Sequence, residues 1–302
     1  NTLSLHDALP ISIAIEEDDN PIPEAMAGLL DTASSLHGSI DTLTYEQSYE
    51  GTVYDKQAFV YVPDSYSPAR PMNVLYLTHG WWGNAAGLAA GVAPVVDKLE
   101  ASGEVSPTIV VFATYYPDRS FATDDYEDDY TLNRFFATTE IDTLISTVES
   151  RYTTFARGDL SDASLRASRR HRAFGGFSMG ATTTWDVFAL RPQYFYGYMP
   201  MAGESWIGRE EDADEERIGQ LVTDGALRAG YGPSDFRILA SVGSEDPALW
   251  DMTPQLDELY QDYPDLMTES SLQVWIDDGE DHSMTSVCNQ VAHNLPLLFP
   301  HS

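Results

Sequence analysis

The sequence predicts an α/β fold in which a mostly parallel central sheet carries helices on both faces. Two observations predict it. Short, continuous apolar runs recur along the chain, as in strands that are buried on both faces. Segments of helical periodicity separate these runs, which is typical of parallel strands joined by crossover helices. With 302 residues, 43% of them hydrophobic, the chain is long enough for one large domain with a substantial core.

The N-terminal part of the chain does not share this pattern. Residues 1–12 fit nothing downstream and resemble translated sequencing-adapter read-through, so we expect them to be a non-native artefact. Residues 13–50 are expected to form an irregular or partly helical lead-in. Residues 51–302 are then a single folded domain. If residues 1–12 are an artefact, the native N-terminus is missing and the compartment is undetermined; we expect secretion, with the cytoplasm as the alternative.

The first half of the domain is expected to contain three strands and one helix. The strands cover 58–63, 73–78 and 108–113, and a proline ends the first of them. The helix covers 132–152, where apolar residues recur at helical spacing.

In the second half, strands and helices alternate regularly. We expect strands at 172–174, 196–201, 236–242 and 272–276, and helices at 181–190, 218–229, 254–260 and 284–297. The sequence shows no internal repeat and no convincing linker.

The charge is strongly acidic, with 48 acidic and 16 basic residues and a net charge of −32. Such a field repels nucleic acid and anionic membranes, so we expect neither as a partner. We interpret the acidity as a solubility surface. The acidic run 124–129 could hold Ca²⁺, but it lacks the spacing and glycine of an EF-hand loop, and we expect no metal site. The single cysteine, Cys288, excludes an internal disulfide and is expected to be a packed apolar residue.

The most informative motif is the Gly-x-Ser-x-Gly sequence around Ser178. It follows the expected strand 172–174 and precedes the expected helix 181–190, which is the context of the nucleophile elbow in α/β-hydrolases. A serine nucleophile must lie on a strained strand-to-helix turn, and Gly176 and Gly180 remove the side chains that would clash there. The motif therefore predicts an α/β-hydrolase fold with Ser178 as the nucleophile.

A serine hydroxyl needs a base, and the base needs an acid that fixes its tautomer. In α/β-hydrolases the acid and then the histidine follow the serine along the chain. His282 is the strongest base candidate because it follows a strand through a turn. For the acid, Asp246 leads because it also follows a strand. Glu245 is its close competitor and Asp251 a weaker one.

An oxyanion hole needs two N–H donors. The first is expected from Met179, the residue after the nucleophile. The second is expected from the loop after the strand 73–78, where Trp81 is our choice and Trp82 the alternative.

These motifs together resemble carbohydrate esterase family 1, in particular the esterase D-like feruloyl esterase modules of bacterial xylanases. The resemblance runs from about Ala58 to Phe299. It is carried by the segments 60–63, 75–80, 167–180, 243–246 and 279–282, of which the segment ending in the elbow is the most specific. The resemblance implies that Ser178, Asp246 and His282 form a catalytic triad.

The same resemblance places Trp206 in the substrate cleft, and we expect the neighbouring Glu204 there as well. Two loops depart from the family's pattern. One carries Trp81 and Trp82 where these esterases usually carry small glycines, and the other spans 114–121 and includes Tyr115. Because both loops lie beside the expected cleft, Trp82 and Tyr115 are further candidate substrate-binding residues.

The resemblance implies a serine carboxylic-ester hydrolase that releases ferulic or related hydroxycinnamic acids from plant cell-wall polysaccharides. No metal or organic cofactor is expected, because the triad chemistry needs none. An acetyl xylan esterase or another small-acyl esterase would use the same triad and remains the alternative. We give less weight to an acyltransferase, or to a non-catalytic carbohydrate-binding protein that has the same fold.

Overall fold

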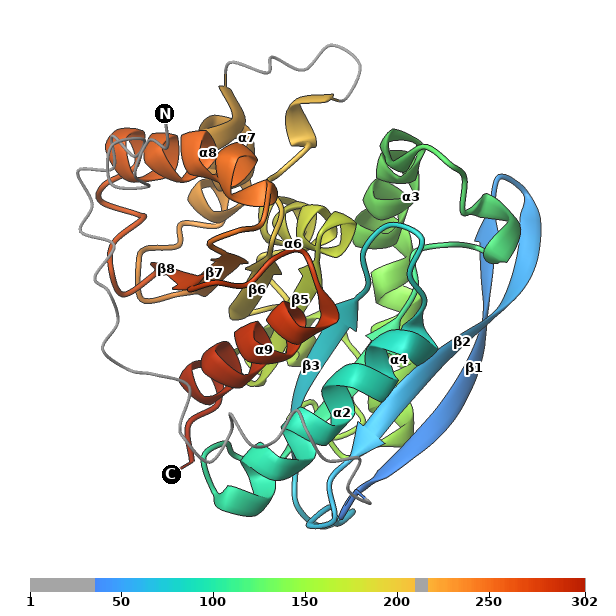
Figure 1. Cartoon of the computed structure of the whole chain (residues 1–302). Helices are drawn as coiled ribbons and strands as arrows, with labels where there is room; N and C mark the ends of the chain where they lie inside the picture. Colours follow the sequence, from blue (N-terminus) through green and yellow to red (C-terminus); the bar gives the residue numbers. More distant parts are fainter. Residues whose placement is uncertain (1–35, 210–216, 302) are drawn as a thin grey trace.

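The computed structural model describes residues 36–209 and 217–301. The expected artefact at 1–12 and most of the lead-in lie outside these residues. Within them, eight strands form one sheet in the order β1-β2-β4-β3-β5-β6-β7-β8. The predicted fold class is confirmed: one mostly parallel sheet carries helices on both faces, as in α/β-hydrolases (Figure 1).

Six strands pair in parallel, and a hairpin extends one edge of the sheet. The parallel strands are β3 (Asn73–Thr78), β4 (Thr108–Ala113), β5 (Arg172–Phe177), β6 (Gly197–Met201), β7 (Arg237–Gly243) and β8 (Leu272–Asp277). The hairpin consists of β1 (Ser39–Tyr49) and β2 (Thr52–Val62), and β2 pairs antiparallel with β4.

Two hydrophobic cores lie on opposite faces of this sheet, since alternate residues of β3 belong to different cores. One core contains side chains of α2 (Ala85–Ser102) and α9 (Met284–Leu298), which lie in front of the sheet in Figure 1. The other packs against α3 (Tyr130–Phe135), the π-helical η4 (Phe136–Glu140), α4 (Ile141–Arg151), α6 (Met179–Leu190), α7 (Ile218–Arg228) and α8 (Ala248–Asp262).

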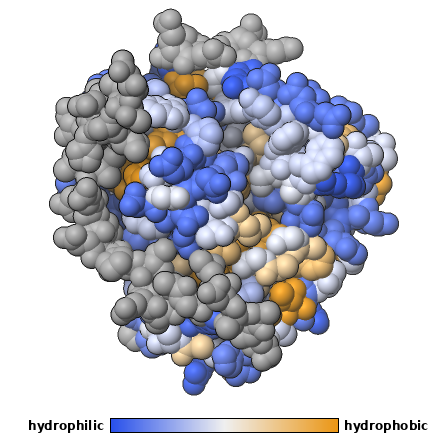
Figure 2. Space-filling view, viewed as in Figure 1, coloured by the Kyte–Doolittle hydropathy of each residue, from blue (hydrophilic) through white to orange (hydrophobic). Residues whose placement is uncertain are grey.

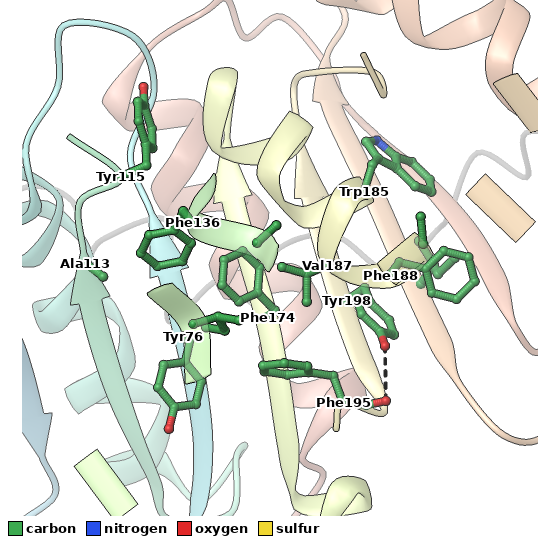
Figure 3. Close-up of a cluster of buried hydrophobic side chains, with 14 of the residues drawn as sticks. Tyr76, Ala113, Tyr115, Phe136, Phe174, Trp185, Val187, Phe188, Phe195 and Tyr198 are labelled. Carbon is green, nitrogen blue, oxygen red and sulfur yellow. Dashed lines mark hydrogen bonds between the residues drawn. The ribbon is translucent and has the colours of Figure 1, made fainter. Parts of the chain in front are cut away.

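The second core is rich in aromatic side chains. Phe174 of β5 meets Phe136 and Phe195 at ring-centroid distances of 6.1 and 5.9 Å, and Phe188 of α6 meets Tyr198 of β6 at 5.0 Å (Figure 3). These contacts pack β5 against η4 and the segment before β6, and they pack α6 against β6.

The expectation of an irregular or helical lead-in is wrong over Ser39–Tyr49. This segment is strand β1, which pairs with the whole of β2, from Ser39 opposite Val62 to Tyr49 opposite Thr52. The domain therefore begins before residue 51. The side chains of Tyr45 and Tyr49 on this strand are buried.

Among the residues that the structure describes, none of the helices has the length and the apolar character that a membrane span requires.

Candidate active site

The nucleophile elbow has the strained geometry that its motif predicts. β5 ends at Phe177, α6 begins at Met179, and Ser178 between them adopts φ 57° and ψ −119°, a region that residues other than glycine rarely occupy. A Cβ atom on Gly180 would lie 2.4 Å from the carbonyl oxygen of Thr78, so β3 closes tightly against the turn. The backbone is thus held in place around Ser178.

Ser178 and His282 line the same pocket, whose volume is about 290 Å³. Leu88 of α2 and Met284 and Val287 of α9 form its apolar wall, and Trp81 lies at its edge. The pocket lies at the carboxyl ends of β3, β5 and β8, where ligand sites of open α/β sheets occur. It is large enough to hold an acyl group beside Ser178.

The structure brings Asp246 and His282 together. His282 Nδ1 donates to Asp246 Oδ2 at 2.8 Å, which leaves Nε2 as the basic nitrogen. The side chain of Asp246 is 0% exposed, and its Oδ1 accepts the N–H of Ala248 at 2.9 Å. The ring of His282 packs against Phe177 at a centroid distance of 4.3 Å. His282 is therefore held in one orientation next to the elbow.

The competing acids do not occupy this position, because Glu245 and Asp251 are both exposed to solvent. Backbone hydrogen bonds join the loop that carries Asp246 to the loop that carries His282. The N–H groups of Ser244 and Glu245 donate to the carbonyl oxygens of Asp277 and Glu280, both at 2.9 Å.

The loop after β3 forms a tight turn, in which the Gly83 N–H donates to the carbonyl oxygen of Gly80 at 3.0 Å. Trp82 adopts φ 61° in this turn, a conformation that favours glycine. Its N–H donates to the hydroxyl oxygen of Tyr116 at 3.1 Å. Because the Trp82 N–H already has an acceptor, Trp81 stays our candidate for the second oxyanion donor, with Met179 at the N-terminus of α6 as the candidate for the first.

A network of buried hydrogen bonds supports this turn on the side that faces the protein interior. The hydroxyl groups of Tyr115 and Tyr116 both donate to Asp129 Oδ2, at 2.9 and 2.6 Å. Burial raises the pKa of Asp129, and the two phenols oppose that rise. From outside, the Arg119 guanidinium donates to the carbonyl oxygens of Trp82 and Gly83 at 2.8 and 2.7 Å. The supporting roles of Tyr116, Asp129 and Arg119 were not anticipated from the sequence.

We expect Tyr116→Phe to lower kcat for a simple ester about ten-fold, because the Trp82 N–H loses its buried acceptor and the turn can shift. Tyr115→Phe is the matched control, since it removes the same kind of bond to Asp129 but leaves the Trp82 N–H paired. Steady-state kinetics of both variants tests this prediction. Equal losses in the two variants would contradict it.

His79 supports the same turn as a neutral side chain. Its Nδ1 donates to the carbonyl oxygen of Gly80 at 2.7 Å, and its Nε2 accepts from the Thr114 hydroxyl at 2.7 Å. Burial is the largest cause that lowers the pKa of His79, to about 4. The imidazole therefore stays uncharged at neutral pH and belongs to the framework under the turn.

This shifted pKa predicts a loss of stability in acid. Between an unfolded pKa of about 6.5 and a folded pKa of about 4, the unfolded state binds the additional proton. The contribution of the neutral His79 side chain to the free energy of unfolding is therefore complete above pH ~6.5. The free energy of unfolding falls by about 3 kcal/mol as the pH drops from there to ~4. Urea unfolding of the wild type and of His79→Asn should show curves that converge over this range. Parallel curves would rule out this role.

The four candidate substrate-binding residues lie in different environments. Trp82 is exposed beside the pocket. Tyr115 is 0% exposed, so its expected place in the cleft is wrong: the hydroxyl is drawn inward by Asp129. Trp206 is only 6% exposed: its ring packs against Tyr126 and Tyr130, and the guanidinium of Arg209 lies 3.5 Å from the ring centroid. The indole N–H of Trp206 donates to Glu204.

Acidic residues of the run 124–129 have local structural roles. Asp125 accepts the Glu127 N–H at 3.0 Å and thereby caps η3 (Tyr126–Asp129), and Asp128 accepts from Thr123 at 3.0 Å. In the described part of the chain, no three His, Cys, Asp or Glu side chains are grouped so that they could hold a metal ion.

The mostly parallel sheet, the strained turn at Ser178 and the paired Asp246 and His282 match the architecture of the α/β-hydrolase class. The chain belongs to the Esterase family, described as "Putative esterase", whose model matches residues 53–290. The match includes Ser178, Asp246 and His282.

Xylanases and feruloyl esterases are among the similar proteins. The chain is 28% identical over 261 residues to endo-1,4-beta-xylanase Y of Acetivibrio thermocellus; the match covers 84% of this chain and 23% of the xylanase. It thus spans about a quarter of that relative's length. A feruloyl esterase module from Clostridium thermocellum, solved with sinapinate, matches with 28% identity and a TM-score of 0.72, covering 87% of this chain and 88% of the module. A ferulic acid esterase of Anaeromyces mucronatus shares the fold, with 17% identity, a TM-score of 0.67 and coverage of 87% and 91%.

Proposed function

We propose that this protein is a serine carboxylic-ester hydrolase that releases ferulic or related hydroxycinnamic acids from esters of plant cell-wall polysaccharides. The observation that carries the proposal is the apolar pocket that Ser178 and His282 share, with Asp246 buried behind His282. The similar feruloyl esterase module bound to sinapinate supports a hydroxycinnamoyl acyl group.

In the proposed reaction, His282 Nε2 accepts the proton of the Ser178 hydroxyl while Oγ attacks the ester carbonyl carbon. The oxyanion accepts hydrogen bonds from the N–H groups of Met179 and Trp81. When the tetrahedral intermediate collapses, the bond to the alcohol oxygen breaks and His282 protonates that oxygen. A water molecule, deprotonated by His282, then attacks the acyl-enzyme and releases the acid.

The wall formed by Leu88, Met284 and Val287 gives the acyl group an apolar surface. Burying an aromatic acyl group there contributes to binding in proportion to the area removed from water. The alcohol side of the ester would then leave the pocket toward solvent.

Hydrolysis of methyl ferulate, measured beside methyl acetate and 4-nitrophenyl acetate, tests the acyl specificity. We expect a higher kcat/KM for methyl ferulate than for methyl acetate, which has the same leaving group, because the apolar wall binds the phenolic ring. Turnover of the acetates alone would retain the serine esterase and move the substrate to small acyl groups, with Trp81 and Trp82 as the residues that narrow the site.

A further inference from the structure

Three exposed aromatic side chains form a continuous row next to the pocket, and the proposed mechanism does not use their rings. This aromatic ridge consists of Trp82, Trp81 and Tyr126, which are 47, 39 and 47% exposed. Neighbouring ring centroids are 5.8 Å apart between Trp82 and Trp81 and 6.0 Å between Trp81 and Tyr126. The face of the molecule in Figure 2 is mostly hydrophilic. Exposed aromatic rings that lie side by side on a protein surface call for an explanation.

Each ring of the ridge is held in place by a neighbouring group. The indole N–H of Trp81 donates to the carbonyl oxygen of Thr123 at 3.1 Å, and the Arg119 guanidinium lies over the Trp82 ring, 5.4 Å from its centroid. Tyr126 rests on Trp206 at a centroid distance of 5.8 Å. Ordered, amphipathic rings bind a partner with little loss of side-chain entropy.

The surroundings of the ridge favour a neutral, hydroxyl-rich partner. Tyr126 lies between exposed carboxylates at Asp124, Asp125, Glu127 and Asp128, and the whole chain carries a net charge of −32. These charges repel nucleic acid and acidic polysaccharides. They can accept hydrogen bonds from sugar hydroxyl groups, while the aromatic faces pack against the apolar faces of sugar rings.

The ridge is also continuous with the active site. Trp81 belongs both to the ridge and to the edge of the pocket that contains Ser178. A chain lying on the ridge therefore passes next to the nucleophile, while an acyl group occupies the space beside Leu88, Met284 and Val287.

We infer that the aromatic ridge is a docking surface for a neutral polysaccharide, which carries the ester along Trp82, Trp81 and Tyr126 to Ser178. The identity of the ester rests on the proposed function. The glycan contact does not, because it can be measured with a polysaccharide that bears no acyl group.

Affinity electrophoresis of Ser178→Ala in de-esterified neutral arabinoxylan tests the inference. In this background, Tyr126→Ala should weaken binding about five-fold, since one stacking ring is lost. Tyr126→Phe keeps the ring and should bind within about two-fold. Trp250→Ala removes an indole that is 55% exposed on α8 and should bind like the parent. Unchanged binding in Tyr126→Ala, or an equal loss in Trp250→Ala, would overturn the inference.

Kinetics of the active protein separates a glycan contact from an acyl contact. In Tyr126→Ala, the KM for feruloylated arabinoxylan should rise about five-fold relative to the KM for methyl ferulate. An equal rise for both substrates would mean that the ridge holds the acyl group, against the inference. If the protein binds arabinoxylan through Tyr126 but cleaves no ferulate, the proposed function fails and the docking surface stands. Circular dichroism of each variant verifies that it is folded.

Discussion

Ser178→Ala is expected to lower kcat for every ester that the protein cleaves by about 10⁴- to 10⁶-fold. The alanine side chain has no oxygen that can attack the carbonyl carbon, so the acyl-enzyme cannot form. The pocket and the N–H groups of Met179 and Trp81 remain, and with them substrate binding. The measurement is turnover of 4-nitrophenyl acetate and methyl ferulate by matched preparations. A variant that retains a tenth of the wild-type rate would show that another group performs the attack.

A stability measurement separates this chemical role from a structural one. The positive φ of Ser178 costs free energy in any residue with a Cβ atom. Ser178→Gly should therefore be about 1 kcal/mol more stable than Ser178→Ala in urea unfolding, while both lack activity. A glycine variant that is no more stable would contradict the strain assigned to the elbow.

The second large effect is expected for Asp246→Asn, which should lower kcat by about 10⁴-fold. The carboxylate accepts both the His282 Nδ1–H and the Ala248 N–H. An amide at this place offers no negative charge to the imidazolium that forms during the attack. Where its NH₂ group faces His282, it also favours the wrong tautomer, with the proton on Nε2.

Glu245→Gln is the matched control, because it removes the same charge from the adjacent, exposed residue. Its kcat should stay within about two-fold of the wild type, as for most surface substitutions. If Glu245→Gln lost more activity than Asp246→Asn, the assignment of the acid would be reversed.

The elements that the sequence predicts best are the buried parallel strands. The expected strands 73–78 and 108–113 coincide with β3 and β4, in which every residue is buried. A strand covered on both faces is a continuous apolar run, and such a run is visible without knowledge of its neighbours. The elbow strand and its helix are equally local, since their glycines and serine are adjacent in the chain.

The elements that were missed depend on partners far away in the sequence. In β1 the buried inner face includes Gln47 between Tyr45 and Tyr49, so no hydrophobic run marks the strand. Helix α2 was not anticipated, and its many alanine and glycine residues give a weak apolar pattern. We expected a helix to start at Pro254. In the structure, α8 begins six residues earlier, at Ala248, and contains the proline.

The same limit applies to the candidate site. The order of Ser178, Asp246 and His282 along the chain and their positions after strands made them the candidates, and the structure joins Asp246 to His282. The sequence did not indicate which of the tyrosine side chains are exposed to solvent. Tyr115 turns inward because Asp129 is buried beneath it, whereas Tyr126 is exposed beside Trp81. The only signal of the buried network was the Tyr115-Tyr116 doublet at the end of a strand.

The most direct measurement of the central claim is labelling with a fluorophosphonate, followed by intact-mass analysis and peptide mapping. The reagent forms a covalent bond with a serine that is activated by a neighbouring histidine. We expect one adduct per chain, located on the peptide that contains Ser178, absent from Ser178→Ala and much slower to form in Asp246→Asn. An unlabelled wild type, or an adduct on a different residue, would contradict the assignment of Ser178 as the nucleophile.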